Sequence, residues 1–239
     1  MQDKIIDCAC VIHGTTYTWD YVEKLHSMVT RHLSWPIRLH VFTESDRPVP
    51  APMIKHDLEI WPGIGGPRSA WWYKMQLFNP ENFAGPLLYF DLDVIISGNL
   101  DWIVASDLDY FWAIRDFKHL WRPESRTLNS SVMYWDTTKF QNIWRQFSNT
   151  DLLKIVAKYK GDQDFLTDAV DTRRQRFFDA DRVHSWRWQA HDGGLDFATR
   201  KYKTPGSGAV VAPTAQILIC HGKPKPHEIL DEFVVKHWR

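Results

Sequence analysis

The sequence is poor in the features that mark several classes of protein. Three cysteines in 239 residues are too few for a disulfide framework. No stretch reaches the ~20 apolar residues that a membrane-spanning helix needs, and residues 1–4, which include an aspartate and lead into a short strand-like run, are unlike a secretory signal. We therefore expect no membrane span and a location in a reducing cytoplasm.

An excess of charge of one sign is also missing. The 29 basic and 29 acidic residues cancel, and residues 171–239 carry 12 basic against 8 acidic side chains. A chain built mainly to grip nucleic acid would show a larger and more clustered basic excess. Aromatic residues, in contrast, are abundant, at 14% with 13 tryptophans. The length and the 44% hydrophobic content predict a single domain, 1–239, with a sizeable core.

Strand-like and helix-like segments alternate along the chain. Residues 4–12 form an apolar run typical of a buried strand, 19–33 carry apolar residues at helical spacing, and 37–43 alternate like a strand. This order favours parallel strands joined by a right-handed crossover. Further strands are expected near 53–55 and at 87–96, 111–114, 131–135 and 217–220, and helices at 69–78, 138–147 and 162–170. The predicted fold class is α/β, with a mixed sheet flanked by helices.

The most informative motif places two carboxylates inside an apolar run, Tyr89-Phe90-Asp91-Leu92-Asp93-Val94-Ile95. A buried, unpaired carboxylate costs several kcal/mol, and a divalent cation held by oxygen ligands compensates that cost. Alternation along an extended strand predicts both side chains on one face. At a strand's carboxyl end they would face the crevice where open α/β sheets bind ligands. The alternative is a strand end with two solvated or capping aspartates.

An Asp-x-Asp motif after an apolar strand has two common meanings. One is the aspartyl nucleophile of haloacid-dehalogenase-type phosphatases, with Asp91 as the attacking group. In those proteins the motif normally opens the domain, whereas 90 residues precede Asp91 here. The later acidic pair that they need is imitated by Asp162 and Asp168, at too wide a spacing. The other meaning is the metal–nucleotide motif of GT-A glycosyltransferases.

Four segments around this motif, in order, resemble the family 8 glycosyltransferases and their relatives over residues 5–228. They are Arg68-Ser69-Ala70-Trp71-Trp72-Tyr73-Lys74, Asn129-Ser130-Ser131-Val132-Met133, Gly161-Asp162-Gln163-Asp164-Phe165-Leu166 and Cys220-His221-Gly222-Lys223-Pro224-Lys225-Pro226-His227. The last segment departs from the family pattern, because His221 and Gly222 are adjacent and the usual spacer is missing. Either Lys223 or Lys225 is therefore the lysine that reaches phosphate.

The resemblance implies a single GT-A (Rossmann-like) domain that transfers a sugar from a nucleotide sugar, a UDP-sugar, with retention of configuration. It implies that Asp91, Asp93 and His221 hold a metal ion, and one imidazole among oxygen ligands favours Mn²⁺ over Mg²⁺. A cation and a lysine stabilise the negative charge that develops on the leaving diphosphate. Of the implied catalytic residues, Gln163 and Asp162, the resemblance places Gln163 near the anomeric carbon and Asp162 or Asp164 on the hydroxyl groups of the donor sugar. The implied donor-binding residues are Ile12, Tyr17, Arg68, Lys74, Asn129, Asp164, Gly222, Lys223 and Lys225.

Several other interpretations stay open. Asp162 and Asp164 also suit a plain helix N-terminus. Cys8, Cys10, Cys220 and His221 suggest a zinc site, although buried strand cysteines are the expected outcome. The glycine-rich residues 62–67 lack a phosphate-loop lysine and are interpreted as a loop over the site. A non-catalytic binder of sugar nucleotides is a further alternative to the enzyme.

The acceptor is not defined by the sequence. Trp186 and Trp188 are the expected contacts for an acceptor glycan, because aromatic rings stack on sugar faces. Aromatics interleaved with basic residues also occur in nucleic-acid sites, so a base in DNA is a minority alternative, as in viral DNA-modifying glycosyltransferases. The arginines of that alternative are Arg173, Arg174, Arg176, Arg182 and Arg187.

Overall fold

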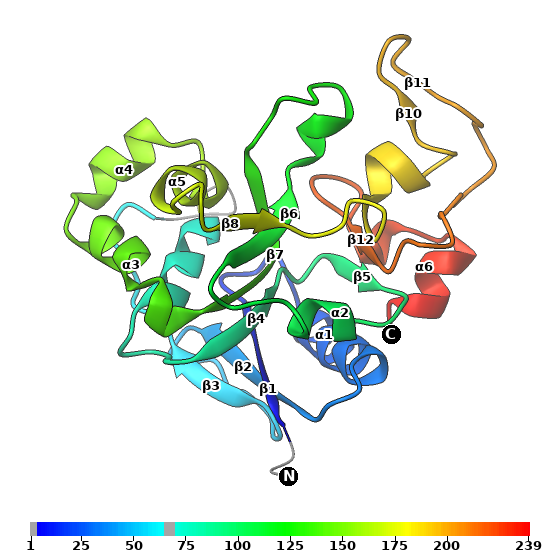
Figure 1. The fold of residues 1–239 in the computed structure, drawn as a ribbon. Helices are drawn as coiled ribbons and strands as arrows, with labels where there is room; N and C mark the ends of the chain where they lie inside the picture. Colours follow the sequence, from blue (N-terminus) through cyan, green and yellow to red (C-terminus); the bar gives the residue numbers. More distant parts are fainter. Residues whose placement is uncertain (1–3, 65–69) are drawn as a thin grey trace.

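A computed structural model describes residues 4–64 and 70–239, and a seven-stranded sheet lies at their centre (Figure 1). Its strand order is β3-β2-β1-β4-β7-β6-β8. The pairs β3–β2, β2–β1 and β1–β4 are parallel. Strand β7 is antiparallel to both β4 and β6, and β8 is parallel to β6. The strands are β1 (Ile6–Val11), β2 (Ile37–Thr43), β3 (Ile54–Asp57), β4 (Pro86–Phe90), β6 (Phe111–Arg115), β7 (Leu128–Asp136) and β8 (Gln175–Phe177).

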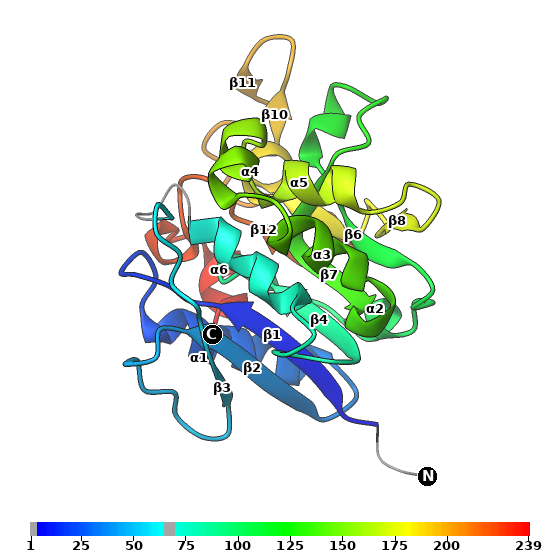
Figure 2. The same ribbon diagram turned by 90° about the vertical axis from the view of Figure 1, so that its left-hand side faces the viewer.

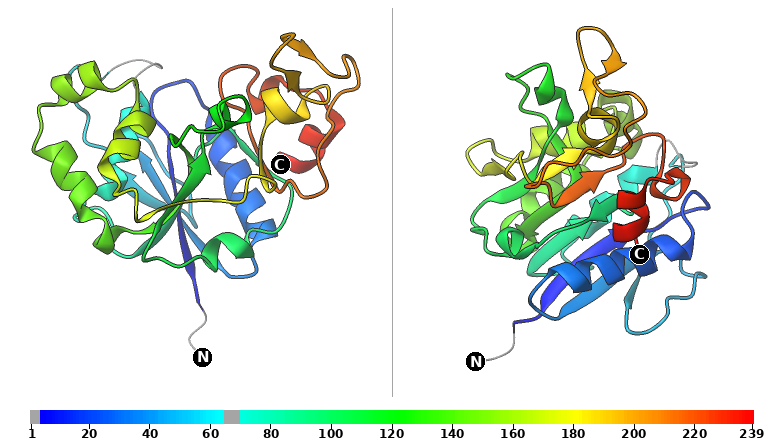
Figure 3. Two further views of the ribbon diagram at one scale, coloured as in Figure 1. Left: turned by 45° about the horizontal axis from the view of Figure 1, so that its top comes forward. Right: turned by 90° about the vertical axis from the view of Figure 1, so that its right-hand side faces the viewer.

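Helices and a smaller sheet cover the two faces of the central sheet (Figures 2 and 3). One face carries α1 (Trp19–His32), α6 (Glu232–His237) and the three-stranded sheet of β5 (Val94–Ile96), β12 (Ile217–Ile219) and β9 (Val183–Ser185). The other carries η1 (Ala70–Phe78), α3 (Gln141–Ser148), α4 (Leu152–Lys158) and α5 (Asp162–Ala169). Shorter elements are α2 (Asp101–Val104), η2 (Phe117–Leu120), η3 (Thr137–Lys139), η4 (Trp186–Ala190), η5 (Pro226–Glu228) and the hairpin of β10 (Leu195–Asp196) and β11 (Lys201–Tyr202).

Alternate residues of the central strands build two separate cores. On β1, Cys8 and Cys10 face the cluster that contains α1, and Ala9 faces the cluster that contains η1 and α3. On β4, Leu88 and Phe90 face the first cluster in the same way. Burial on both faces explains why these strands read as continuous apolar runs rather than as an alternating pattern.

The predicted α/β class and most predicted segments are confirmed. The principal correction concerns the motif at Asp91 and Asp93, which does not lie inside one strand. β4 ends at Phe90, the chain turns at Leu92, and β5 begins at Val94 in the smaller sheet. The segment before the motif is a 3-10 helix, η1, and β7 begins three residues earlier than expected. No helix in the described ranges is long and apolar enough to cross a bilayer.

A chain of polar side chains crosses β1, β2 and β3 on the η1 side of the sheet. The guanidinium of Arg38 donates to both carboxylate oxygens of Asp7 at 2.6 and 2.7 Å. His40 lies 3.0 Å from Asp7 and 2.8 Å from His56. The ring of His56 stacks on Phe42 with centroids 4.4 Å apart. Burial and the neighbouring His40 lower the pKa of His56 to about 4.

We expect this histidine to make the fold sensitive to acid. The neutral form is favoured in the folded state, so its contribution is complete above pH 6.5 and is lost as the pH falls toward 4. Because His56 is only partly buried, the loss at pH 4.5 should be about 1–2 kcal/mol. Urea unfolding of wild type and His56→Gln at pH 7 and pH 4.5 measures it. The stability difference between them should narrow at the lower pH, and a constant difference would contradict the assignment.

Candidate active site

Several of the predicted site residues, among them Lys74, Asp91 and Asp162, meet at one edge of the central sheet. Because β1, β2 and β4 are parallel and β7 runs against them, the carboxyl ends of the first three lie beside the amino end of β7. The amide of Asp91 donates to the carbonyl of Ser131 at 2.8 Å and fixes this junction. The residues that follow β4 are therefore placed beside the residues that begin β7, as the ordered motifs require.

Lys74 lies at the centre of a buried polar cluster. Its ammonium group is 2.8 Å from Asp91, 3.2 Å from Asp162 and 3.0 Å from the hydroxyl of Ser130. Ser130 donates to Asp162 at 2.5 Å, and the hydroxyl of Tyr89 donates to Asp91 at 2.7 Å. The charges of Asp162 and Asp91 hold the pKa of Lys74 above its ordinary value although burial opposes this. Lys74 is therefore a fixed cation that joins η1, β4 and α5.

Asp93 belongs to a second cluster next to the first. Its carboxylate accepts a hydrogen bond from Tyr17 at 3.1 Å and pairs with Lys225 at 2.5 Å. Its backbone carbonyl accepts from the amide of Cys220 at 3.0 Å, which ties it to the end of β12. Burial and the nearby charge of Asp91 raise the pKa of Asp93. The charges of the two aspartates therefore interact, and both residues lie in the turn that connects β4 of the large sheet to β5 of the small one.

Acidic groups exceed basic groups in these two clusters. Asp91, Asp93 and Asp162 share two ammonium groups, those of Lys74 and Lys225. Burial raises the pKa of Asp162 as well as that of Asp93, so ionised carboxylates here are costly unless further positive charge arrives. The arrangement favours binding of a cation.

His221 lies apart from the aspartates. Its Nε2 atom is 2.7 Å from the hydroxyl of Ser185, at the end of β9, and its ring stacks on Phe117 and meets Trp188 edge-on. Burial, Arg187 and Lys225 lower the pKa of His221 to about 4, so the imidazole is neutral at physiological pH. A neutral imidazole is the form that ligates metal, but its present partner is a hydroxyl group.

The described residues provide two of the three ligands expected for a divalent cation. Asp91 and Asp93 are adjacent carboxylates of the kind that Mg²⁺ and Mn²⁺ prefer. Within 4–64 and 70–239, no three His, Cys, Asp or Glu side chains lie close enough together to hold a metal ion. The three-residue set with His221 thus stays a prediction, and His221 must leave Ser185 to join it.

The closing segment separates its two lysines. Lys225 reaches Asp93 and also lies over the ring of Tyr17, 5.5 Å from its centroid. Lys223 is exposed and pairs with Glu228. Gly222, between His221 and these lysines, has a φ of 76°, which favours glycine. The structure therefore brings Lys225, and not Lys223, to the aspartates.

The three polar residues at the start of α5 differ in the contacts that their side chains make. Asp162 is buried in the Lys74 cluster, and the side-chain oxygen of Gln163 accepts from the amide of Ser130 at 3.4 Å. Asp164 is partly exposed and makes no side-chain hydrogen bond or ion pair with any described residue. On the β7 side, Asn129 accepts from the amide of Ser131 at 3.0 Å. Gln163 and Asn129 thus border the Lys74 cluster from two elements.

Two residues near the end of β1 that were expected to bind the donor, Ile12 and Tyr17, are already engaged within the chain. Ile12 is buried and its amide donates to the carbonyl of Phe42, so that N–H is not free to read a base. Tyr17 points its hydroxyl at Asp93. A hollow of about 470 Å³ lies nearby, bounded by Trp19 and by residues 47–50. Arg68 and residues 65–67 of the glycine-rich loop fall outside the described residues.

Three hydroxyl-bearing residues of this region were not predicted from sequence, namely Ser130, Tyr89 and Ser185. Ser130 and Tyr89 lie within motifs that the sequence did point out, but their roles depend on contacts with Asp162 and Asp91. Ser185 contacts His221 because β9 and β12 pair in parallel with Ser185 opposite Ile219. That pairing has no local sequence signal.

Of the two tryptophans expected to contact an acceptor, the structure leaves only Trp188 partly exposed. Trp186 is only 2% exposed and belongs to the core, so its indole face cannot serve as an open platform, whereas Trp188 is partly exposed. Of the five arginines of the nucleic-acid alternative, four are occupied within the chain. Their partners are Asp171 for Arg173, the Asp109 and Lys139 carbonyls for Arg174, backbone carbonyls and Tyr110 for Arg176, and Asp179 for Arg182.

The three cysteines are buried, as the sequence indicated. Cys8 and Cys10 lie in β1, and Cys220 follows β12. Burial raises the pKa of each thiol, and all three are free. They are packing residues of the core around α1.

No protein-family model and no curated protein matches this chain in sequence. Comparison of structure finds glycosyltransferases. An active-site mutant of LgtC superposes with a TM-score of 0.62 at 14% identity, over 97% of this chain and 93% of that chain. Another LgtC structure is of a galactosyltransferase in complex with donor and acceptor sugar analogues.

Two larger glycosyltransferases share the same architecture. The apo form of GlyE from Streptococcus pneumoniae TIGR4 superposes with a TM-score of 0.64 at 16% identity, over 98% of this chain and 59% of that chain. The bifunctional glycosyltransferase WbbM gives 0.63 at 12% identity, over 94% and 47%. The chain thus spans nearly all of LgtC and about half of the larger proteins. It has the fold of the GT-A glycosyltransferases, which confirms the fold expected from the motifs.

Proposed function

We propose that this chain, as one domain of residues 1–239, is a metal-dependent glycosyltransferase. It takes its sugar from a nucleotide sugar, a UDP-sugar, and transfers it with retention of configuration. The observation that carries the proposal is the pair of adjacent acid clusters around Lys74 and Lys225, at the sheet edge where this fold presents its strand ends. The fold favours a transferase over the phosphatase alternative.

Each cluster has its own task in this proposal. Asp91 and Asp93 hold a divalent cation, Mn²⁺ or Mg²⁺, and His221 completes the ligand set after it leaves Ser185. When bound, the cation offsets the negative charge that develops on the leaving diphosphate. Lys225 contributes its ammonium group to the same diphosphate, since it already lies against Asp93.

The Lys74 cluster orients the sugar. Lys74 and Ser130 hold Asp162 in place, and Asp162 with Asn129 faces the hydroxyl groups of the donor sugar. Gln163, fixed by the amide of Ser130, lies at the anomeric carbon as a positioning group. The charged core of the site is therefore rigid before the donor arrives, which lowers the reorganisation required in the reaction.

Thermal unfolding with a panel of UDP-sugars, with and without Mn²⁺, tests the proposal. One UDP-sugar with Mn²⁺ should raise Tm by about 5 °C or more at saturating concentration. UDP release from that donor should require Mn²⁺ and should fall at least ~100-fold in Asp93→Asn. Asp109→Asn, an exposed aspartate paired with Lys139, is the matched control and should retain the rate.

The alternatives give different results. A non-catalytic binder would show the rise in Tm with no release of UDP. A phosphatase would respond to no sugar nucleotide and would hydrolyse a phosphoester with Mg²⁺. Release of UDP that is equally fast without Mn²⁺ and in Asp93→Asn would contradict the metal role.

A further inference from the structure

Two projections of the chain pack side by side through aromatic rings. One comprises residues 117–126, from η2 onward, and the other comprises 186–203, from η4 through the β10–β11 hairpin (Figure 1). The rings of Trp121 and Trp188 lie 4.9 Å apart, and those of Trp121 and Phe197 lie 4.6 Å apart. Trp188 in turn lies 4.4 Å from His221. A partly exposed aromatic wall thus runs from the closing segment of the site onto both projections.

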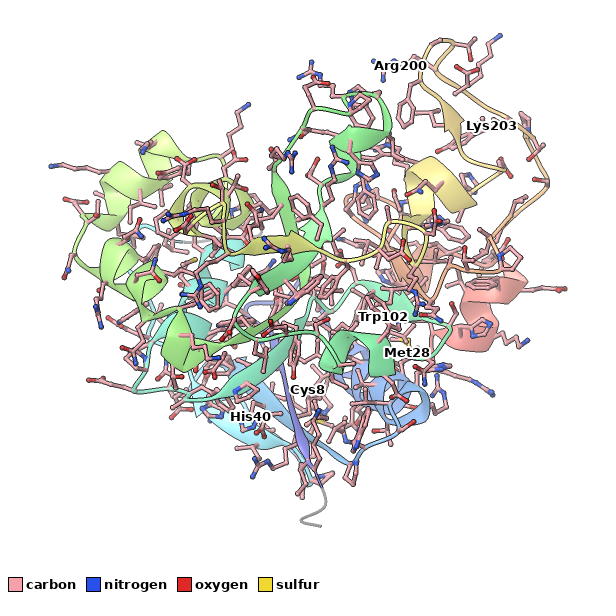
Figure 4. The ribbon with its side chains drawn as sticks, in the orientation of Figure 1. Cys8, Met28, His40, Trp102, Arg200 and Lys203 are labelled. Carbon is pink, nitrogen blue, oxygen red and sulfur yellow. The ribbon has the colours of Figure 1, made fainter. Side chains whose placement is uncertain are left out.

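Positive charge is concentrated on the same two projections. Residues 117–126 and 186–203 carry seven lysines and arginines against three acidic residues, in a chain whose net charge is zero. Two of the three acidic side chains, Asp192 and Asp196, already accept hydrogen bonds from backbone amides. Figure 4 shows Arg200 and Lys203 on the hairpin, at the opposite end of the molecule from Cys8 and His40.

Six of these cations have no partner among the residues that the structure describes. No side-chain hydrogen bond or ion pair joins them to any residue in 4–64 or 70–239. All six are exposed, namely Arg122, Arg126, Arg187, Arg200, Lys201 and Lys203. By contrast, four of the arginines in 171–182 are occupied by carboxylates, carbonyls or rings. Unpaired cations grouped beside an aromatic wall favour an anionic ligand with flat apolar faces.

We propose that the aromatic wall and its six cations, hereafter the acceptor patch, bind an acidic oligosaccharide. This inference rests on the proposed function, because the patch adjoins the site and the bound chain is the acceptor. Its sugar faces pack on Trp121, Trp188 and Phe197, and its acidic groups pair with the surrounding cations. A nucleic acid is disfavoured because the three rings pack edge-on or tilted against one another, at 85°, 75° and 35°. They form one wall, not separate platforms for successive bases.

A matched pair of ligands tests the patch in the wild-type protein. Labelled hexagalacturonate and its fully methyl-esterified form have the same sugars and differ in charge. At low salt the acid should bind at least ~10-fold more tightly by fluorescence anisotropy, and added salt should reduce the difference. Equal affinities would overturn the proposal. Tighter binding of heptathymidylate, which has six phosphates, would overturn it in favour of a nucleic acid.

Charge reversals then locate the binding site. The double variant Arg122→Glu/Arg200→Glu changes one exposed cation on each projection and should weaken hexagalacturonate binding at least ~10-fold. Lys154→Glu/Lys236→Glu, two exposed cations on α4 and α6, is the control and should bind within about twofold of wild type. Equal loss in both variants would contradict the patch. The response of Tm to UDP-sugar and Mn²⁺ is a separate readout, so its failure in wild type would count against the proposed function alone.

Discussion

Replacing Lys74 by methionine should destabilise the protein by about 3–5 kcal/mol, because it leaves buried carboxylates without their cation. Lys74 is 6% exposed and contacts Asp91, Asp162 and Ser130. Urea unfolding at pH 8 measures the loss. The matched control is Lys139→Met, which removes an exposed lysine paired with Asp109 and should cost far less than Lys74→Met, because solvent screens an exposed pair.

The pH dependence of this destabilisation gives a second readout. Without Lys74, burial raises the pKa of Asp162 further, so the carboxyl takes up a proton in the folded state as the pH falls. The unfolded chain binds that proton less readily, so lowering the pH raises the free energy of unfolding of the variant relative to that of wild type. The stability difference from wild type should therefore shrink between pH 8 and pH 5. A loss that equals that of Lys139→Met, or that does not change with pH, would show that Lys74 does not neutralise the cluster.

Lys225→Met should reduce the rate of UDP release by about 10²- to 10³-fold, the usual cost of removing one group that stabilises developing charge. Lys225 lies against Asp93 and Tyr17, whereas Lys223 is exposed and pairs with Glu228. Lys223→Met is therefore the natural control and should stay within about threefold of wild type. Rates are measured with saturating donor and Mn²⁺, so that the comparison reports kcat.

The opposite ranking of the two lysines would be informative. A large loss in Lys223→Met with a small loss in Lys225→Met would mean that the closing segment rearranges when the donor binds. Equal small losses would remove both lysines from the reaction. Neither outcome would alter the test of Asp93, which uses a different residue and a different control.

The elements that the sequence predicted are those with a strong local signal. Helix α1 and strand β2 follow from helical spacing and alternation, and their bounds agree closely with the structure. Asp91 and Asp93 left open a strand end after Phe90, but the change of sheet was not predictable, because β4 and β5 are both mostly buried and apolar. Two buried apolar strands give no local sign of whether they belong to one sheet or to two.

The site was predictable at the level of motifs and not of partners. Ordered motifs indicated Asp91, Asp162 and Lys74, and these meet in one cluster. The contact of His221 with Ser185 depends on the register of β9 against β12, which are separated in the chain by η4 and the β10–β11 hairpin. The burial of Trp186 likewise depends on what covers it. Such long-range contacts have no periodic signature in a single sequence.

The change of sheet between the two aspartates has a mechanical consequence. Asp91 is fastened to the large sheet through the Ser131 carbonyl, and Asp93 to the small sheet through the Cys220 amide. A ligand bound by both carboxylates would therefore connect the large sheet to the small sheet. A shift of one sheet relative to the other would change the distance between the carboxylates and so weaken or strengthen that binding. In the proposed mode of donor binding, occupancy of the site and the alignment of the two sheets would therefore depend on each other.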